Sequence, residues 1–347
     1  MIYSLAKPLL FQLDAERAHG MTIAGLKAVP IGPAPKSDPI LETCFAGLTF
    51  PNPIGMAPGF DKNGEVPDAL VRLGFGYAEV GTLTPLPQTG NPKPRVFRLI
   101  EDKAVINRLG FNNEGQEKAM PRLKQMRSRM GKGVLGINIG ANKDSDDRIA
   151  DYVIGVQNMA PLADYLTVNI SSPNTPGLRA LQDKGALEEL LAAVMKARGK
   201  NTVPVFLKVA PDLEPADVDD IVDVVGKQKL DALIVSNTTI TRNDLKSRNQ
   251  KETGGLSGAP LKEMAQQRLK DFRAASGGNI PLIGVGGIAT AKDAYDRIRA
   301  GASLVQLYTG MIYEGPTIAR CMASELAKLL KQDGFHSVSE AVGTGDK

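Results

Sequence analysis

The sequence has no long hydrophobic run, few cysteines and little excess charge of either sign. No stretch approaches the roughly 18 apolar residues of a membrane-spanning helix, and charged residues interrupt the N-terminal segment where a signal peptide would lie. Cys44 and Cys321 cannot form a disulfide framework and indicate a reducing compartment. The net charge of +4 is too small and too dispersed to indicate nucleic-acid binding. These absences favour a protein that neither crosses a membrane nor binds nucleic acid.

What the sequence does contain is a repeating alternation of strand and helix patterns. With 347 residues, 42% of them hydrophobic, the chain can bury a sizeable core. Eight apolar strands are predicted, at residues 54–57, 77–82, 134–139, 165–170, 205–209, 232–236, 282–285 and 304–308. Helical patterns lie between them, at residues 65–73, 117–130, 187–197, 215–225, 261–274, 291–300 and 316–330. This alternation favours an α/β fold, a (β/α)8 TIM barrel, over a doubly wound sheet.

A helical extension, residues 1–36, precedes this alternation. Leu5, Leu9 and Leu13 recur at helical spacing, and Pro8 is predicted to mark the start of the first helix. Asp14 is predicted to cap a second helix over residues 15–29. Two interpretations stay open: a helical hairpin packed on the main domain, or an amphipathic lid that touches a membrane surface.

The barrel domain is predicted to cover residues 37–335, followed by a polar tail at 336–347. Two insertions interrupt it. Residues 95–107 resemble a small antiparallel excursion, and residues 239–255 are long, polar and end in glycine, as expected of a mobile lid over a site.

The most distinctive segment is the loop at residues 169–177, Asn-Ile-Ser-Ser-Pro-Asn-Thr-Pro-Gly, which follows a predicted buried strand. Its prolines and glycine exclude both helix and strand, and its side chains donate and accept hydrogen bonds without charge. Taken alone, the segment is more simply a turn. The other predicted strands end in similar polar residues, however, and the carboxyl ends of parallel barrel strands converge on one face. We therefore predict a pocket there, containing Lys62, Lys208 and several asparagines.

The predicted pocket lacks the groups of common hydrolytic sites. No His, Asp and Glu cluster indicates a metal, and His19 and His336 both lie outside the barrel, which excludes a Ser-His-Asp triad. Glycines at 284–287 would let backbone N–H groups approach a phosphate, beside Tyr308 and Thr309 at the last strand end. Such a pocket suits a large, anionic, hydrogen-bonding ligand, which indicates a cofactor.

Three motifs closely resemble those of dihydroorotate dehydrogenases. They are residues 58–62 (Pro-Gly-Phe-Asp-Lys), 107–113 (Asn-Arg-Leu-Gly-Phe-Asn-Asn) and 169–175 (Asn-Ile-Ser-Ser-Pro-Asn-Thr). Residues 254–258 and 304–308 fit as well, and the resemblance runs from about residue 3 to residue 330. It implies an FMN-binding barrel that oxidises (S)-dihydroorotate to orotate in de novo pyrimidine (UMP) biosynthesis. Phe60 stands where leucine is common and Thr309 where serine is common, and neither change removes a needed donor.

The family divides by its catalytic base. Cytosolic class 1 members carry cysteine at the position matching Ser172, whereas membrane-associated class 2 members carry serine and have an N-terminal helical extension that binds quinone. This chain resembles class 2 in both respects. The resemblance therefore implies a membrane quinone as electron acceptor and a peripheral membrane protein on the cytoplasmic face of a bacterial inner membrane. His19 and Arg98 would anchor the quinone.

The same resemblance implies a role for individual residues. Ser172 would be the catalytic base and Thr175 part of its proton relay. Residues expected at the FMN are Pro58, Gly59, Phe60, Asp61, Lys62, Thr82, Asn138, Asn169, Lys208, Ser236, Gly258, Gly287, Tyr308 and Thr309. Those expected at the substrate are Lys62, Asn107, Arg108, Leu109, Gly110, Phe111, Asn169, Asn174, Asn237 and Thr238. Three alternatives stay open: a flavin barrel with another substrate, a phosphate-binding isomerase or aldolase, and a non-catalytic membrane-surface protein.

Overall fold

Eight parallel strands close into a barrel in the computed structural model of this chain, which describes residues 2–345. Their order around the barrel is β10-β12-β13-β3-β4-β7-β8-β9. The strands are β3 (Ile54–Met56), β4 (Tyr77–Leu83), β7 (Val134–Ile139), β8 (Tyr165–Asn169), β9 (Val205–Val209), β10 (Ala232–Val235), β12 (Leu282–Val285) and β13 (Ala302–Leu307). Each predicted strand is confirmed to within two residues at either end. The closed barrel confirms the TIM-barrel prediction and excludes the doubly wound sheet.

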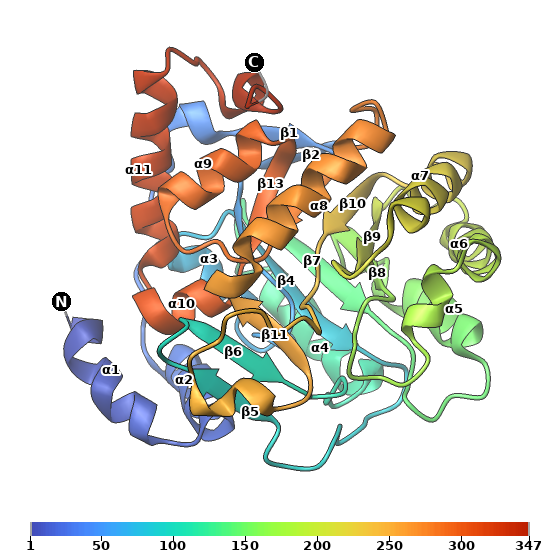
Figure 1. Cartoon of the computed structure of the whole chain (residues 1–347), viewed down its shortest axis with the longest axis horizontal. Helices are drawn as coiled ribbons and strands as arrows, with labels where there is room; N and C mark the ends of the chain where they lie inside the picture. Colours follow the sequence, from blue (N-terminus) through green and yellow to red (C-terminus); the bar gives the residue numbers. More distant parts are fainter. Residues whose placement is uncertain (1, 346–347) are drawn as a thin grey trace.

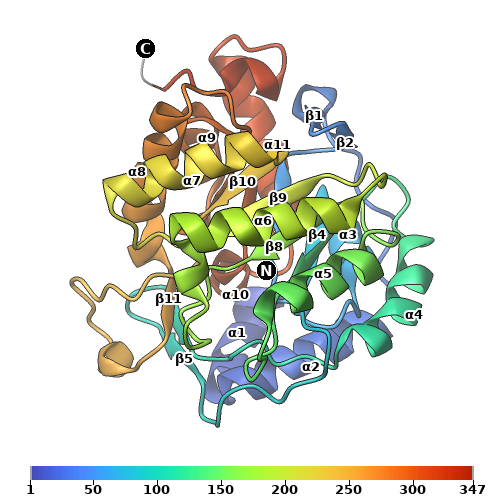
Figure 2. The same ribbon diagram turned by 90° about the vertical axis from the view of Figure 1, so that its right-hand side faces the viewer.

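Helices surround the barrel (Figure 1), and Figure 2 shows α5 to α8 side by side on its outside. They are α3 (Pro67–Arg72), α4 (Gln116–Arg127), α5 (Arg148–Met159), α6 (Lys184–Arg198), α7 (Pro215–Gln228), α8 (Lys262–Ala275), α9 (Ala291–Arg299), α10 (Thr309–Glu314) and α11 (Ile318–Gln332). Short 3-10 turns are η1 (Pro39–Leu41), η2 (Arg179–Gln182), η3 (Arg248–Lys251), η4 (Ala259–Leu261) and η5 (Val338–Ala341). All seven predicted helices are present, whereas α5 and α10 were not predicted from the sequence.

Aromatic side chains fill the amino-terminal end of the barrel. A two-stranded hairpin covers this end; its strands are β1 (Thr43–Phe45) and β2 (Leu48–Phe50). Phe45 packs edge-on against Phe206 with ring centroids 5.6 Å apart, and Phe50 packs against Tyr77 at 5.2 Å. In Figure 1 this hairpin and the N-terminal helices lie at opposite ends of the molecule. Because side chains fill the amino-terminal end of the barrel, a site is expected at the opposite end, where the strands have their carboxyl ends.

A three-stranded antiparallel sheet stands at that other face. Its strands are β5 (Val96–Leu99), β6 (Ala104–Asn107) and β11 (Gly255–Gly258), with β6 in the middle. The predicted antiparallel excursion at residues 95–107 is therefore confirmed. The third strand was not predicted, and it begins at the last residue of the 239–255 insertion.

The N-terminal extension packs on this sheet and on α10 (Figure 1). It contains α1 (Ile2–Gln12) and α2 (Ala15–Ala28), and Asp14 caps α2 by accepting from the amides of Glu16 and Arg17, as predicted. Lys7 Nζ donates to the carbonyl of Tyr313 at 2.9 Å. The predicted role of Pro8 is wrong, because Pro8 lies inside α1, where it removes one helical hydrogen bond without ending the helix.

These contacts confirm that the helical hairpin packs on the barrel domain, while contact with a membrane stays a prediction. Between residues 2 and 345, no helix has the length and apolar character needed to cross a bilayer. Met1, where the predicted extension begins, and Asp346 and Lys347, where the predicted tail ends, lie outside the described residues. Within the tail, Val338 and Ala341 are fully buried, and the Gly343 amide donates to the Ile298 carbonyl of α9 at 3.1 Å. The domain boundaries themselves stay a prediction.

Candidate functional site

A large cavity opens at the carboxyl ends of the barrel strands. Its volume is about 620 Å³, a size typical of cofactor and substrate sites. Its inner end is lined by residues that end or follow β3, β8, β9, β10, β12 and β13. Its outer end is lined by α1, α2 and the small sheet. The cavity therefore connects the barrel face with the N-terminal extension.

Hydrogen-bonded amides and hydroxyls fix the loop that follows β8. Asn169 Nδ2 donates to Thr82 Oγ1 and to Asn138 Oδ1, both at 3.1 Å. Asn169 Oδ1 accepts from Ser171 Oγ at 2.8 Å, and Asn237 Nδ2 donates to the same hydroxyl at 2.9 Å. Asn169, Thr82, Asn138 and Ser171 are all buried. The network joins four strand ends and holds the loop in one conformation.

Ser172 lies on this loop and faces the cavity, with only 5% of its surface exposed. Its Oγ accepts from the Asn174 amide at 3.3 Å, and Asn174 Nδ2 donates to Asn107 Oδ1 at 3.3 Å. Thr175 is also buried, and its Oγ1 has no hydrogen-bond partner among residues 2–345. Leaving a buried hydroxyl unpaired costs free energy, which marks Thr175 as a candidate for transient hydrogen bonding during a reaction.

Two lysines line the cavity, of which Lys208 is buried and Lys62 is half-buried. Lys208 is 4% exposed; burial lowers its pKa, and the negative charge of Glu79 opposes this effect. Lys62 follows β3, and burial lowers its pKa to about 8 despite the opposing charge of Glu16. At neutral pH Lys62 is therefore mostly protonated. Cations beside uncharged hydrogen-bonding groups in a cavity suit a ligand that is anionic and rich in amides.

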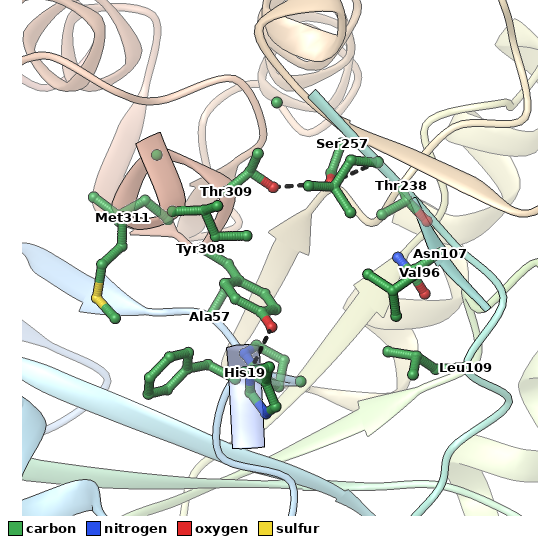
Figure 3. Close-up of a pocket in the computed structure, with 18 of the residues that line it drawn as sticks. His19, Ala57, Val96, Asn107, Leu109, Thr238, Ser257, Tyr308, Thr309 and Met311 are labelled. Carbon is green, nitrogen blue, oxygen red and sulfur yellow. Dashed lines mark hydrogen bonds between the residues drawn. The ribbon is translucent and has the colours of Figure 1, made fainter. Parts of the chain in front are cut away.

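Three rings meet where α2 approaches the barrel (Figure 3). His19 Nδ1 lies 3.3 Å from the Tyr308 hydroxyl, and its Nε2 lies 3.2 Å from Lys62 Nζ. The ring of Phe60 packs edge-on against both His19 and Tyr308, with centroids 5.5 and 5.7 Å apart. Burial and the charge of Lys62 lower the pKa of His19 to about 3. His19 is therefore neutral at physiological pH and contacts the site directly, although it lies outside the barrel as predicted.

The glycines after β12 form a tight backbone turn beside the start of α10. Gly286 and Gly287 have φ values of +109° and +71°, which favour glycine. An added Cβ at Gly287 would lie 2.4 Å from Lys262 Cα, so no larger residue fits. Thr309 Oγ1 lies 2.8 Å from Ser257 Oγ on β11, as drawn in Figure 3. Backbone amides and hydroxyls of this kind can bind a phosphate group.

The outer part of the cavity is an apolar groove beside the two N-terminal helices. Its lining from the extension includes Leu10, Phe11, Leu26, Val29 and Ile31. Arg98 of β5 also lines it and donates to the Leu13 carbonyl at 2.7 Å, with its guanidinium 5.0 Å from the Phe11 ring centroid. Burial lowers the pKa of Arg98.

Most of the predicted site residues come together in this cavity. Those that line it are His19, Pro58, Gly59, Phe60, Lys62, Thr82, Arg98, Asn107, Leu109, Gly110, Phe111, Asn169, Ser172, Asn174, Lys208, Ser236, Asn237, Thr238, Gly258, Gly287, Tyr308 and Thr309. No residue of the predicted lid at 239–255 is among the lining residues. Its covering role and its mobility stay predictions.

Four predicted residues do not line the cavity. Asp61 is turned away, because its carboxylate accepts from the amides of Glu65 and Val66, both at 2.8 Å. Arg108 is drawn outward by an ion pair with Glu252 at 2.7 Å. Asn138 and Thr175 are buried behind the lining residues described above. For Asp61 and Arg108 the structure thus supports a local structural role.

Sequence reasoning missed several residues that shape the site. Glu79, fully buried on β4, accepts hydrogen bonds from Asn138 and Gln306. A charged residue inside the otherwise apolar run Tyr-Ala-Glu-Val was a signal that could have identified it. Glu16 forms a two-point ion pair with the buried Arg95, at 2.6 and 3.0 Å. Arg95 gave no such signal, because ion pairs between distant segments are not visible in a sequence.

Comparison with known proteins is consistent across sequence and structure. The family model described as dihydroorotate dehydrogenase matches residues 40–330. A curated protein of Novosphingobium aromaticivorans, named dihydroorotate dehydrogenase (quinone), is 61% identical over 99% of both chains. One of the same name from Erythrobacter litoralis is 62% identical over 99% of this chain and 100% of its own length. The crystal structure of DHODH in complex with ferulenol from Eimeria tenella has a TM-score of 0.92 and 42% identity, covering 96% of this chain and 98% of that one.

Proposed function

The chain is an oxidoreductase of the dihydroorotate dehydrogenase family, and from this membership we propose that it oxidises (S)-dihydroorotate to orotate through bound FMN and reduces a membrane quinone. This reaction would serve de novo pyrimidine (UMP) biosynthesis. The observation that carries the proposal is a single cavity in which Ser172, two lysines and the asparagine network lie at one end and the apolar groove of the N-terminal extension at the other. A phosphate-binding isomerase or aldolase has no need of such a groove.

The inner cavity fits an FMN. Gly287, Tyr308 and Thr309 would hold the phosphate, and Thr82, Asn138, Asn169 and Gly258 the ring and ribityl groups. Pro58, Gly59, Phe60, Lys62 and Ser236 would complete the site, with Asp61 supporting its loop. When bound, FMN supplies a two-electron acceptor. Lys208 supports this assignment, because it is a lysine that lines the cavity with only 4% of its surface exposed. A buried ammonium stabilises negative charge on a neighbouring ring.

Dihydroorotate carries a carboxylate and ring amides, and the lining offers a partner for each. Lys62 would bind the carboxylate, while Asn107, Asn169, Asn174, Asn237 and Thr238 would bind the ring. Leu109, Gly110 and Phe111 line the same wall, and Arg108 supports it from outside. Orientation by several fixed amides can lower a barrier by several kcal/mol, up to roughly 7–11 kcal/mol in the best intramolecular cases.

Ser172 is the proposed base, taking a proton from a ring carbon onto its Oγ. A serine hydroxyl is a weak base in water, so it needs a closed site and a group that receives its own proton. Ser172 is nearly excluded from solvent, and the unpaired Oγ1 of Thr175 belongs to the same loop. Thr175 would therefore act as part of a relay rather than as a second base.

Quinone would reach the site through the groove between the N-terminal helices and the barrel. His19 and Arg98 would bind its carbonyl groups, because both are polar side chains facing an otherwise apolar groove. The outer surface of the extension exposes Leu5, Leu9 and Met21, an arrangement that supports peripheral contact with a membrane. We place the protein on the cytoplasmic face of a bacterial inner membrane. Deleting residues 1–35 should leave substrate oxidation intact but abolish quinone reduction and membrane association.

The experiment that tests the proposal is flavin analysis followed by substrate bleaching. Protein purified from cells should show a flavin spectrum, release FMN on denaturation, and bleach under anaerobic conditions when dihydroorotate is added, with orotate as product. A flavin spectrum that does not respond to dihydroorotate would indicate a flavin barrel with another substrate. A colourless protein that FMN cannot reconstitute would contradict the proposed cofactor.

A further inference from the structure

The guanidinium of Arg179 joins the ends of three neighbouring barrel strands. Arg179 begins η2, in the segment between β8 and α6. Its Nε donates to the Ser171 carbonyl at 3.2 Å, and its Nη2 donates to the Thr238 carbonyl at 3.1 Å. Its Nη1 forms an ion pair with the Asp212 carboxylate at 3.0 Å. These three partners follow β8, β10 and β9, which are paired side by side in the barrel.

Arginine suits this arrangement because its N–H groups point in fixed directions within one plane. Each of the three nitrogens of Arg179 holds a different strand end, so the three ends cannot shift independently of one another. Lysine carries the same charge but has one nitrogen on a flexible chain, and it cannot reproduce the planar fork. The Arg179 and Asp212 side chains are 23% and 15% exposed, so their ion pair is largely shielded from solvent.

The partners of this contact are themselves fixed. The Asp212 carboxylate also accepts from the hydroxyl of Thr239 and from the amide of Ile240, the latter at 3.3 Å. At the other end of η2, Gln182 Oε1 accepts from the amide of Ala210, which follows β9, at 2.9 Å. The short turn η2 is thus tied to its neighbouring strand ends at both of its own ends.

The two carbonyl groups that Arg179 holds belong to residues beside the proposed reaction. The Ser171 carbonyl is part of the planar peptide group that leads into Ser172, so holding it fixes the direction in which Ser172 begins. The side chain of Thr238 lines the cavity (Figure 3). Arg179 itself does not line the cavity, and it therefore contacts this wall from behind.

We infer that Arg179 is a positioning residue, which holds the loop that carries Ser172 in place against the substrate-binding end of β10. Asp212 supplies its counter-charge. The inference rests on the proposed function, since it assumes that Ser172 is the base and that Thr238 binds the substrate. A displacement of about 1 Å can slow a reaction about 100-fold. Loss of this contact should therefore slow substrate oxidation, although it removes no group that touches substrate or flavin.

The first measurement is the rate of bleaching at saturating dihydroorotate in FMN-bound Arg179→Lys. The matched control is Arg198→Lys, because Arg198 is also 23% exposed and pairs with Asp231 at the opposite end of the barrel, at 3.3 Å. Arg179→Lys should bleach about tenfold more slowly or less, and Arg198→Lys at the wild-type rate. A wild-type rate in Arg179→Lys, or equal slowing in both variants, would overturn the inference.

A double-mutant cycle separates positioning of the base from a general loss of structure. In a Ser172→Ala background there is no hydroxyl to position, so the addition of Arg179→Lys should change the residual bleaching rate by no more than about twofold. Slowing by the same factor with and without the Ser172 hydroxyl would overturn the inference.

Asp212→Ala covers the case in which Arg179→Lys folds poorly, because it removes the counter-charge and one of the three acceptors. It should also slow bleaching, and only while Ser172 is present. A wild-type rate in FMN-bound Asp212→Ala would overturn the inference. Bleaching of the wild-type enzyme is recorded beside each variant. Its failure would contradict the proposed function, whereas normal wild-type bleaching with unaffected variants would contradict only the role of Arg179.

Discussion

Nε2 of His19, on α2 of the N-terminal extension, lies 3.2 Å from Nζ of Lys62 at the end of the first barrel strand. Because His19 has a pKa of about 3, its ring is neutral and its Nε2 can accept a hydrogen bond from the Lys62 ammonium. The other nitrogen then carries the proton and donates to the Tyr308 hydroxyl, 3.3 Å away. This pair is the direct contact between the proposed quinone groove and the proposed substrate site.

The first prediction concerns the charge of Lys62. Its pKa of about 8 means that the free enzyme loses this cation as the pH rises above 8. If Lys62 binds the substrate carboxylate, the Kd for orotate should rise above that pH, approaching about tenfold per pH unit. Orotate binding, followed by its effect on the flavin spectrum, measures this directly. Lys62→Met should bind weakly with little pH dependence, and a wild-type Kd that stays constant to pH 10 would show that Lys62 does not hold the carboxylate.

The second prediction concerns stability in acid. His19 has a lowered pKa in the folded state, so the unfolded state binds the extra proton as the pH falls below about 6.5. Folding stability should therefore decline between pH 6.5 and 3, by about 2 kcal/mol at pH 5 from this residue. Chemical denaturation of wild type and His19→Gln at pH 7 and pH 5 isolates the effect. The variant should lose less stability than wild type over this interval, and equal losses would contradict the assigned burial.

The third prediction concerns the ion pair that joins the extension to the barrel domain. Arg95 is 6% exposed and its partner Glu16 is 20% exposed, so Glu16→Gln leaves a buried guanidinium without its counter-charge. We expect a loss of about 2 kcal/mol or more, faster proteolysis within the extension and slower quinone reduction. Substrate-dependent bleaching should persist at neutral pH but should fail at a lower alkaline pH than in wild type, because the charge of Glu16 also raises the pKa of Lys62.

Lys27→Met provides the control for this ion pair. The Lys27 side chain is 52% exposed in its pair with Glu65, and such pairs contribute at most about 1 kcal/mol. Equal effects of Glu16→Gln and Lys27→Met on proteolysis of the extension would show that the Arg95 contact does not hold it in place.

The barrel was predictable because its strands are short apolar runs bounded by glycine and polar residues. Two elements were missed for a local reason. Gly155 interrupts α5, yet a glycine suits the packing there because an added Cβ would lie 3.1 Å from the Ile139 side chain. Gly310 similarly weakens the pattern of α10. At these positions the choice of glycine follows from packing, although glycine has a low propensity to form helices.

Other features depend on contacts between segments far apart in the sequence. β11 is rich in glycine and becomes a strand only by pairing with β6. The motifs indicated the strand-end residues of the site, but not that Asp61 and Arg108 would be held by Glu65, Val66 and Glu252. Whether a polar side chain faces a cavity or a neighbour is decided by tertiary packing, which a single sequence does not report.

The most direct test of the proposed function is the rate of flavin bleaching by dihydroorotate in Ser172→Ala, measured by anaerobic stopped flow at neutral pH. Ser172 is nearly buried on the β8 loop, and its Oγ is the proposed proton acceptor. The variant should bind FMN and orotate as wild type does, because neither contact depends on its hydroxyl, and should bleach between about 10² and 10⁴ times more slowly. Bleaching at the wild-type rate in a variant that retains both ligands would contradict the assignment of Ser172 as the base.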